Sequence, residues 1–193
     1  MPMRLLRIHR DVQGVTLIEF IMMLAILGIV IGGIYGFVVN GAISASRTND
    51  FLQTQSQIRS ALDNIVDESR WGQSVTAATA TSVTVQMPGN TQYCSGGAYT
   101  VTFAYDSTNK AITRNASAPC PNAGTAVTLA YLVVGAGGTT GLTFTYYDGG
   151  NTSFGSTPSA GQLAQIARIR AVVATTSNKV TRYLAGDAAL RAH

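Results

Sequence analysis

The pattern of apolar and polar residues divides the chain into two parts with different periods. The first part begins with a run from Val15 to Val39, in which almost every residue is apolar and Glu19 is the single charged residue. About 20 apolar residues are enough to cross the hydrocarbon core of a bilayer as an α-helix. A charged side chain inside such a span is costly, so Glu19 needs a partner of opposite charge.

Helical spacing continues beyond this run. No proline occurs between Val15 and Trp71. The pattern predicts one helix from about Val15 to about Ser69, with a membrane-spanning part over residues 15–39 and an amphipathic part over residues 40–70. The apolar face of the amphipathic part recurs at near-heptad intervals, at Phe51, Ile58, Leu62 and Ile65.

After Trp71 and Gly72 the helical spacing gives way to alternation of apolar and polar residues. Alternating runs bounded by turn residues predict β-strands. A loop is expected over residues 152–161, and residues 161–167 could begin a short helix. One long helix followed by a mostly antiparallel sheet is an α+β fold, with one globular domain over residues 71–193. Strands are predicted over residues 82–87, 99–105, 111–114, 125–134, 142–147, 165–175 and 179–191.

The charge balance narrows the choice of partners. Charged residues make up only 11% of the chain, and the net charge of +4 overstates its basic character. Half of that charge comes from Arg4, Arg7 and Arg10 against Asp11, so the rest of the chain is close to neutral. This balance argues against nucleic acid as a partner. Basic residues before an apolar span favour a cytoplasmic N-terminus and an exported C-terminal part.

The two cysteines, Cys94 and Cys120, both lie in the part that we expect to be exported. An even cysteine count in an oxidising compartment suggests one disulfide, which would close a loop of about 27 residues and stabilise the fold by about 3 kcal/mol. The alternative is two free or separately buried thiols. Two cysteines without a nearby histidine make a poor zinc site, because structural zinc takes four ligands.

Residues suited to catalysis are scarce. The only histidines are His9 and His193, which nearly excludes a Ser-His-Asp or Cys-His arrangement. The glycine-rich run over residues 135–141 looks like a dinucleotide loop, but Thr140 stands where the fingerprint needs a small Gly or Ala, and a strand follows. A hairpin or bulge connection is the better interpretation. We therefore expect no enzyme activity, no cofactor and no metal.

Three groups of polar residues have weaker candidate roles. Asp63, Asp67 and Glu68 cluster near the helix end and are interpreted as a solvated face rather than as acid–base catalysts. Asp148 and Asn151 lie in a Gly-rich turn, where turn chemistry accounts for them and calcium binding is the alternative. Basic residues late in the chain indicate a solvated sheet face or an intersubunit contact, with DNA binding as the alternative. They are Arg168, Arg170, Lys179, Arg182 and Arg191.

The first 40 residues carry the most specific signal in the chain. They begin with the segment MPMRLLRIHRDVQG, which ends at Gly14 and is followed directly by V-T-L-I-E-F, residues 15–20. This resembles the class III signal of type IV prepilins and pseudopilins. The resemblance implies that residues 1–14 are a leader that a prepilin peptidase removes, and that the new amino terminus at Val15 is methylated. It also implies that Glu19 pairs with the amino terminus of a neighbouring subunit.

The same resemblance implies a set of partners and a location. The partners are other pilins or pseudopilins, the prepilin peptidase, and an assembly ATPase with its membrane platform. The chain would lie first in the inner membrane as a single-pass protein with a cytoplasmic N-terminus, and afterwards in a periplasmic or cell-surface filament. Two features depart from the commonest family pattern. Val15 replaces the usual Phe, which suggests a minor component, and the helix lacks the proline often found in its second half.

The C-terminal part carries a second resemblance. The motif F-x-Y-Y-D-G at residues 144–149 precedes I-x-R-I-R-A-V-V at residues 166–173, and A-L-R follows at residues 189–191. This order is similar to that of J-type pseudopilins of type II secretion and W-type minor pilins of type IV pili. Those families are larger minor subunits at filament tips, which is what the resemblance implies for this chain.

An ordinary secretory signal or signal anchor is the alternative to the prepilin signal. Ser44-Ala45-Ser46 could pass for a cleavage site, but the apolar run is longer than the usual core of about 7–15 residues in a signal peptide. Under that alternative the chain is a membrane-anchored extracellular binding domain. Within the resemblance, a DNA-uptake competence pseudopilin stays open beside the pilus and secretion subunits.

Overall fold

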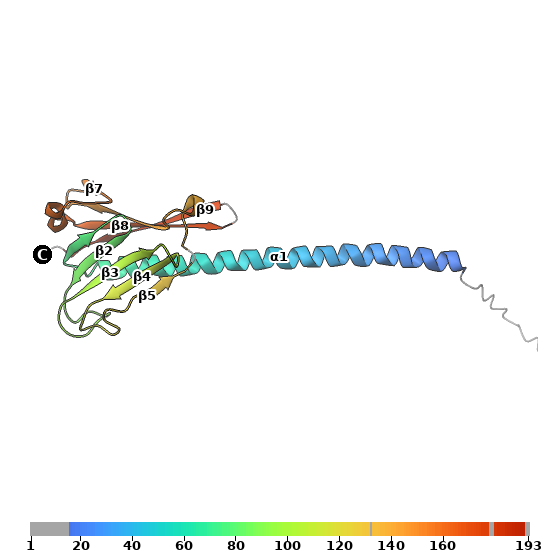
Figure 1. The fold of residues 1–193 in the computed structure, drawn as a ribbon, viewed down its shortest axis with the longest axis horizontal. Coiled ribbons are helices and arrows are strands. Elements are labelled where there is room, and N and C mark those ends of the chain that lie inside the picture. Colours follow the sequence, from blue (N-terminus) through green and yellow to red (C-terminus); the bar gives the residue numbers. More distant parts are fainter. Residues whose placement is uncertain (1–15, 132, 178–179, 192–193) are drawn as a thin grey trace, which may run out of the picture. The chain divides into compact units, whose positions relative to one another are not determined.

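A computed structural model describes residues 16–131, 133–177 and 180–191. Within them, one long helix, α1 (Leu17–Ser69), is followed by nine β-strands and two short 3₁₀ helices (Figure 1). By its contacts the chain forms two units, residues 1–48 and 49–193. The long helix followed by antiparallel sheets confirms the predicted α+β fold.

The first unit holds the apolar part of α1. The helix is long and apolar enough to cross a membrane over Leu17–Ser46, judged by length and composition. Its large apolar side chains are exposed along the whole segment. Leu17, near its start, is 77% exposed, and Phe37 is 82% exposed. A continuous apolar surface of this size fits a lipid or protein environment better than water. Val15, where the helix was predicted to begin, lies outside the described residues.

The second unit begins with the end of α1, which carries the predicted apolar face. Ile58, Leu62 and Ile65 are at most 5% exposed, which confirms the predicted face for these three residues. The side chain of Phe51, the fourth, lies outside the described part of the structure. The helix stops in a tight turn in which the Gly72 amide donates to the Ser69 carbonyl at 2.9 Å. Glycine is needed there because a Cβ atom would collide with the side chain of Val85.

The first sheet has five antiparallel strands in the order β1-β2-β3-β4-β5. Alternation directs Val83, Val85 and Met87 into the core, where each is 0% exposed. The β3 and β4 strands form the predicted hairpin, with Asp106 opposite Ala111. The strands are β1 (Ser74–Ala78), β2 (Ser82–Met87), β3 (Tyr99–Asp106), β4 (Ala111–Ala116) and β5 (Val127–Ala130).

The second sheet has four antiparallel strands in the order β7-β6-β8-β9. Ile169, Ala171 and Val173 of β8 face inward as predicted, at 2% exposure or less. The 3₁₀ helix η2 (Ala160–Gln165) precedes β8, which agrees with the short helical start expected there. The strands are β6 (Leu142–Tyr147), β7 (Ser153–Gly155), β8 (Arg168–Ser177) and β9 (Val180–Ala189).

Three details of the strand prediction are wrong. The β sheet is divided into two, and the alternation missed β1 and β7, which are five and three residues long. The strand predicted over residues 125–134 is only β5, because a uniformly apolar run does not show which face is buried. After Tyr131 the backbone of Val133 instead bonds with the Lys110 carbonyl and the Tyr105 hydroxyl.

The glycine-rich run over residues 135–141 turns back on itself, since Val134 and Thr140 form an antiparallel bridge, but it does not join two neighbouring strands of one sheet. It contains the 3₁₀ helix η1 (Ala136–Gly138) and connects β5 of the first sheet to β6 of the second. Gly137 and Gly138 have φ values of 66° and 80°, which favour glycine. A strand follows the run, as predicted, and this is not the strand–loop–helix context of a dinucleotide fingerprint.

Candidate functional site

Glu19 lies in the first turn of α1 and follows a capping threonine. The Phe20 amide donates to the Thr16 carbonyl at 3.1 Å, and the Glu19 amide donates to the Thr16 hydroxyl at 3.4 Å. Thr16 is therefore the N-cap, and Glu19 stands three residues later, at the spacing of a capping box. The N-terminal end of a helix is partially positive, so it favours a carboxylate in its first turn.

The surroundings of Glu19 are otherwise apolar and open. Its neighbours Leu17, Ile18 and Phe20 are exposed at 77%, 70% and 55%. No ion pair joins the Glu19 carboxylate to any residue that the structure describes. The predicted processing residues, Gly14 and Val15, lie outside the described residues. The charge of Glu19 is thus balanced by no described cation within its own chain.

Glu68, at the other end of the same helix, is buried rather than part of a solvated face. It is 1% exposed, whereas Asp63 and Asp67 are exposed as predicted. The Arg114 guanidinium donates to both of its carboxylate oxygens, from Nε to Oε2 and from Nη2 to Oε1, each at 2.6 Å. A bidentate pair of this kind satisfies a buried carboxylate with defined geometry.

Two sequence signals could have revealed this pair. Glu68 follows Ile58, Leu62 and Ile65 at helical spacing, on the face that packs on the sheets. Arg114 occupies an inward position of β4, two residues after the buried Ile112. A charge at a core position of each element requires a partner, but only the folded chain shows that each is the other's partner.

The ion pair extends into a hydrogen-bonded network with β3. The Tyr99 hydroxyl donates to Glu68 Oε1 at 3.4 Å and shares a 2.9 Å hydrogen bond with the Thr91 hydroxyl. Burial raises the pKa of the Tyr99 hydroxyl, and the hydrogen bond with Glu68 raises the pKa of Arg114. Both groups therefore keep their protons at neutral pH, and the network is a structural one.

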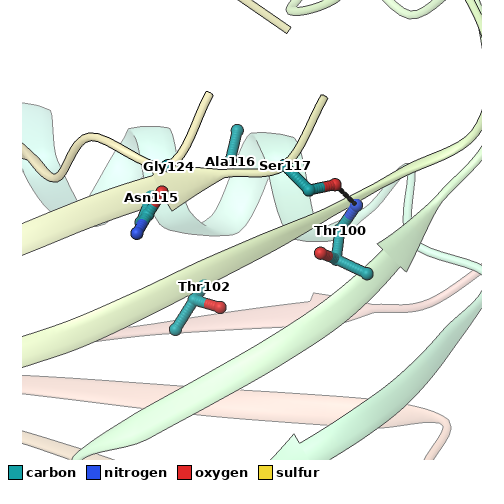
Figure 2. A pocket seen from close by; sticks show the side chains of 6 residues that line it. All are labelled: Thr100, Thr102, Asn115, Ala116, Ser117 and Gly124. Atoms are coloured by element: carbon teal, nitrogen blue, oxygen red, sulfur yellow. Dashed lines mark hydrogen bonds between the residues drawn. The ribbon is translucent and has the colours of Figure 1, made fainter. Parts of the chain in front are cut away.

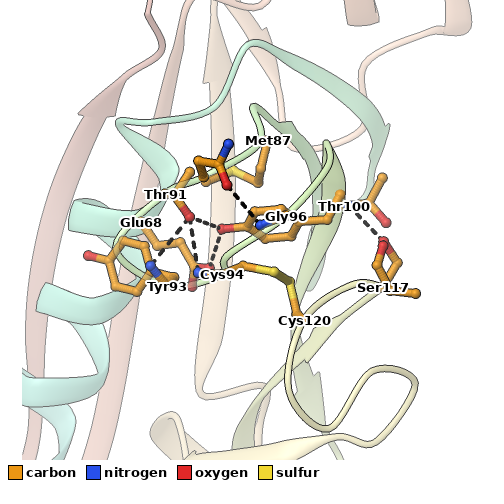
Figure 3. The surroundings of a disulfide bond; sticks show 12 residues. Glu68, Met87, Thr91, Tyr93, Cys94, Gly96, Thr100, Ser117 and Cys120 are labelled. Carbon is orange, nitrogen blue, oxygen red and sulfur yellow. Dashed lines mark hydrogen bonds between the residues drawn. A yellow bond between two sulfur atoms is a disulfide. The ribbon is translucent and has the colours of Figure 1, made fainter.

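The predicted disulfide between Cys94 and Cys120 is present and lies beside this network. Figure 3 shows Glu68, Thr91 and Cys94 close together around it. The Cys94 amide donates to the Thr91 hydroxyl at 3.2 Å, and the two cysteine Cα atoms are 5.0 Å apart. The helix end, β4 and the cysteine loop are thus joined through Glu68, Arg114, Tyr99 and Thr91.

A shallow pocket of about 210 Å³ lies on the first sheet beside the disulfide loop (Figure 2). The Thr100 amide donates to the Ser117 hydroxyl at 2.9 Å in its wall. Thr102 lies at the other side, where its hydroxyl bonds with Thr84 at 2.9 Å. The lining consists of neutral residues: Thr100, Thr102, Asn115, Ala116, Ser117 and Gly124. Such a lining offers hydroxyl and amide groups but neither an acid nor a base.

One of the late basic residues, Arg168, binds the Gly-rich turn. Lys179, another of them, lies outside the described residues. Arg168 donates to the Asp187 carboxylate at 2.6 Å and to the Asn151 side chain, and its guanidinium lies 3.8 Å from the centre of the Tyr147 ring. The Asp148 carboxylate accepts the Thr152 amide at 2.7 Å. Turn and ion-pair chemistry account for these side chains, and the described residues contain no group of three metal-ligating side chains.

No protein-family model matches the sequence, and no curated protein matches it either. The function has to be argued from the residues themselves. Of the predicted site residues, the structure joins Cys94 to Cys120 and leaves Glu19 without a described ionic partner.

Proposed function

We propose that this protein is a structural subunit of a type IV pilus-like filament, a minor pilin or pseudopilin that is first held in the inner membrane. The proposal is supported by the order of features along α1. A prepilin-like segment at residues 1–14 precedes a capped helix start, an apolar span over Leu17–Ser46 and a packed helix end. It has no catalytic step and no cofactor.

The observation that carries the proposal is the lone charge of Glu19. A carboxylate in an apolar span is costly unless a positive charge meets it. Within the described residues Glu19 has no ionic partner, so a partner from another chain would remove that cost. The amino terminus of a neighbouring subunit, released by cleavage after Gly14, supplies such a charge. Their attraction is strong because the core of a helical filament has a low dielectric constant.

The order of events follows from this pairing. Prepilin peptidase cuts between Gly14 and Val15 and methylates the new terminus. An assembly ATPase and its membrane platform then move the apolar helix from the bilayer into the filament, where Glu19 sets its register. The globular domain chooses the neighbours. Likeness to J-type pseudopilins and W-type minor pilins supports a place at the filament tip.

A charge-removing variant tests the proposal. We expect Glu19→Ala to be inserted in the membrane but to be lost from filaments sheared off the cells. Ile18→Ala is the matched control, because it changes an exposed apolar neighbour and leaves the carboxylate in place. Immunoblots of the membrane and sheared fractions make the comparison. Wild-type amounts of Glu19→Ala in the sheared fraction would contradict the proposal.

The phenotype of a deletion strain shows which kind of filament machine the protein belongs to. A deletion strain scored for twitching, exoprotein secretion and transformation distinguishes a pilus subunit, a secretion pseudopilin and a DNA-uptake pseudopilin. The competing function is an extracellular binding domain on an ordinary signal anchor. That function predicts indifference to Glu19→Ala in every one of these assays.

A further inference from the structure

The four edges of the two sheets are protected to different degrees. β1 has a bulge between Val75 and Ala77, and η2 packs beside it. β5 and β7 are four and three residues long. β9, by contrast, pairs with β8 without interruption over ten residues, from Val180 to Ala189. Within the described residues, β9 is the long and regular edge (Figure 1).

Two hydrogen bonds show which backbone groups of β9 point away from the sheet. The Ala174 amide donates to the Gly141 carbonyl beside β6, at 2.7 Å. The backbone N–H and C=O groups of successive residues point to opposite edges of a strand. Those of Val173 in β8 therefore point toward β9, where they meet Leu184. The Leu190 amide donates to the carbonyl of Ala167, just before β8, at 2.8 Å. Leu190 is an even number of residues from Leu184, so both hydrogen bonds assign the same residues to the inner side.

The outward-pointing backbone groups therefore belong to every second residue of β9. Proline, lysine and bulges commonly protect such edges. β9 has no proline or lysine among its residues. It carries two charged residues, Arg182 and Asp187, and Asp187 is engaged by Arg168. Tyr183 is 64% exposed. The residues with outward N–H and C=O groups are Thr181, Tyr183, Ala185, Asp187 and Ala189.

The inner face of β9 restricts what can pair with it. A Cβ atom at Gly186 would lie 2.6 Å from Val66 Cγ2 and 3.2 Å from Leu62 Cγ, so α1 passes directly under this strand. A second copy added about a two-fold axis would bring its own helix under the next strand, about 4.8 Å away. Packed helices need about 8–10 Å between their axes. Self-pairing is therefore disfavoured, and the occupant must be a strand without such a helix beneath it.

We propose that the free edge of β9 is a strand-addition site for an extended segment of a different protein chain. The segment would pair its main chain with the outward groups of β9. Its alternate side chains would lie beside Leu184, which is only partly buried, so they should be apolar. The side chains between them would lie beside the exposed Tyr183 and Ala185, so they should be polar or small.

Site-specific photo-crosslinking in cells that make the full chain tests the site. The photoreactive residue p-benzoylphenylalanine replaces Tyr183, and in a control it replaces Tyr131, which is exposed to a similar degree at 57%. Mass spectrometry then locates the crosslinked peptide. We expect position 183 to join one segment of a different chain, with the alternating pattern described, and position 131 not to join it.

A backbone substitution shows whether the main chain carries the binding. Ala185→Pro removes one outward N–H group without removing a bond to β8, whereas Ala185→Thr keeps it. We expect the crosslink to fall about tenfold in the proline variant and to persist in the threonine variant. Trp71 fluorescence and an intact disulfide report folding. If Ala185→Pro does not fold, Ala189→Pro, at the strand end, removes an equivalent N–H group.

Three results would overturn the site. They are a crosslink from position 183 no stronger than from position 131, a crosslink between two copies of this chain, and a crosslink that survives the proline variants. The edge exists whether or not the chain is cut after Gly14. If the strand-addition proposal fails, the proposed filament function therefore still stands. The loss of Glu19→Ala from filaments would be observed independently.

Discussion

The two glutamates of this chain lie on the same helix in opposite surroundings. Glu68 is 1% exposed, and both of its oxygens are bound by Arg114 at 2.6 Å. Glu19 is exposed on an apolar span and meets no described cation. The carboxylate of Glu68 joins the helix end to β4 within one chain. Under the proposed function, the carboxylate of Glu19 instead pairs with a neighbouring subunit.

The largest expected effect on stability breaks the internal pair. Arg114→Met leaves the Glu68 carboxylate buried without its cation, which should lower the free energy of unfolding by about 3–5 kcal/mol. Urea unfolding of the full chain in detergent micelles, followed by the fluorescence of its single tryptophan, Trp71, measures it. Glu19→Gln is the control and should leave the unfolding midpoint unchanged. An equal loss in both variants would remove the distinction between the two glutamates.

The second effect concerns the disulfide beside that pair. Replacing Cys94 and Cys120 together by serine frees a loop of about 27 residues, which should lower the free energy of unfolding by about 3 kcal/mol in the chain-entropy account. The same urea titration measures it. Because Thr91 links the cysteine loop to Glu68 through Tyr99, combining this change with Arg114→Met should depart from additivity. Strict additivity would show that the loop and the ion pair act separately.

A smaller effect sharpens the comparison at the exposed end of the helix. Thr16→Val removes the hydroxyl that accepts a hydrogen bond from the Glu19 amide. This should destabilise the first turn of the helix by about 1 kcal/mol. Thr16→Ser keeps the hydroxyl and is the matched control. Amide hydrogen exchange of residues 17–20 in micelles measures the fraying of this turn. Equal exchange in the two variants would deny Thr16 its capping role.

The smallest effect is a pH dependence in the β3–β4 turn. Hydrogen bonds from Asn109 and Thr108 lower the pKa of the exposed Asp106 carboxyl. A carboxyl whose pKa is lower in the folded state adds stability above its unfolded pKa of about 4, and this is lost as the pH falls through the folded value. Asp106→Asn should remove this contribution to the fall in stability at acid pH. Unfolding midpoints measured between about pH 2 and pH 5 show it. An unchanged fall would assign it to other carboxylates.

The sequence predicted α1 and the α+β class because these rest on local patterns. It predicted the disulfide because the chain has two cysteines, both in the part expected to be exported. The helix needs only apolar spacing without proline, and the longer strands, such as β2 and β3, alternate clearly. The division into two sheets and the Glu68–Arg114 pair could not be predicted in this way. They depend on contacts between residues far apart in sequence, here 46 positions for the ion pair.

The candidate site residues also differ in whether a local sequence pattern predicts their role. Glu19 stood out because a single charge interrupts an apolar run, whereas Glu68 was placed on a solvated face because it clusters in sequence with Asp63 and Asp67. The free edge of β9 has no local signal at all. It follows from the strand order, in which β9 has β8 as its one neighbouring strand among the described residues. Just beyond β9, the Arg191 amide donates to the Gly72 carbonyl at 3.1 Å, so the free edge ends there.

The mass of the mature N-terminus tests the central claim most directly. Intact-protein and peptide mass spectrometry would be carried out on the chain from cells with and without prepilin peptidase. The account predicts a chain that begins at N-methylated Val15 in the first cells and retains residues 1–14 in the second. A start near Ser46, or an intact Met1 in both, would contradict it and would leave the β-domain as the place to look for function.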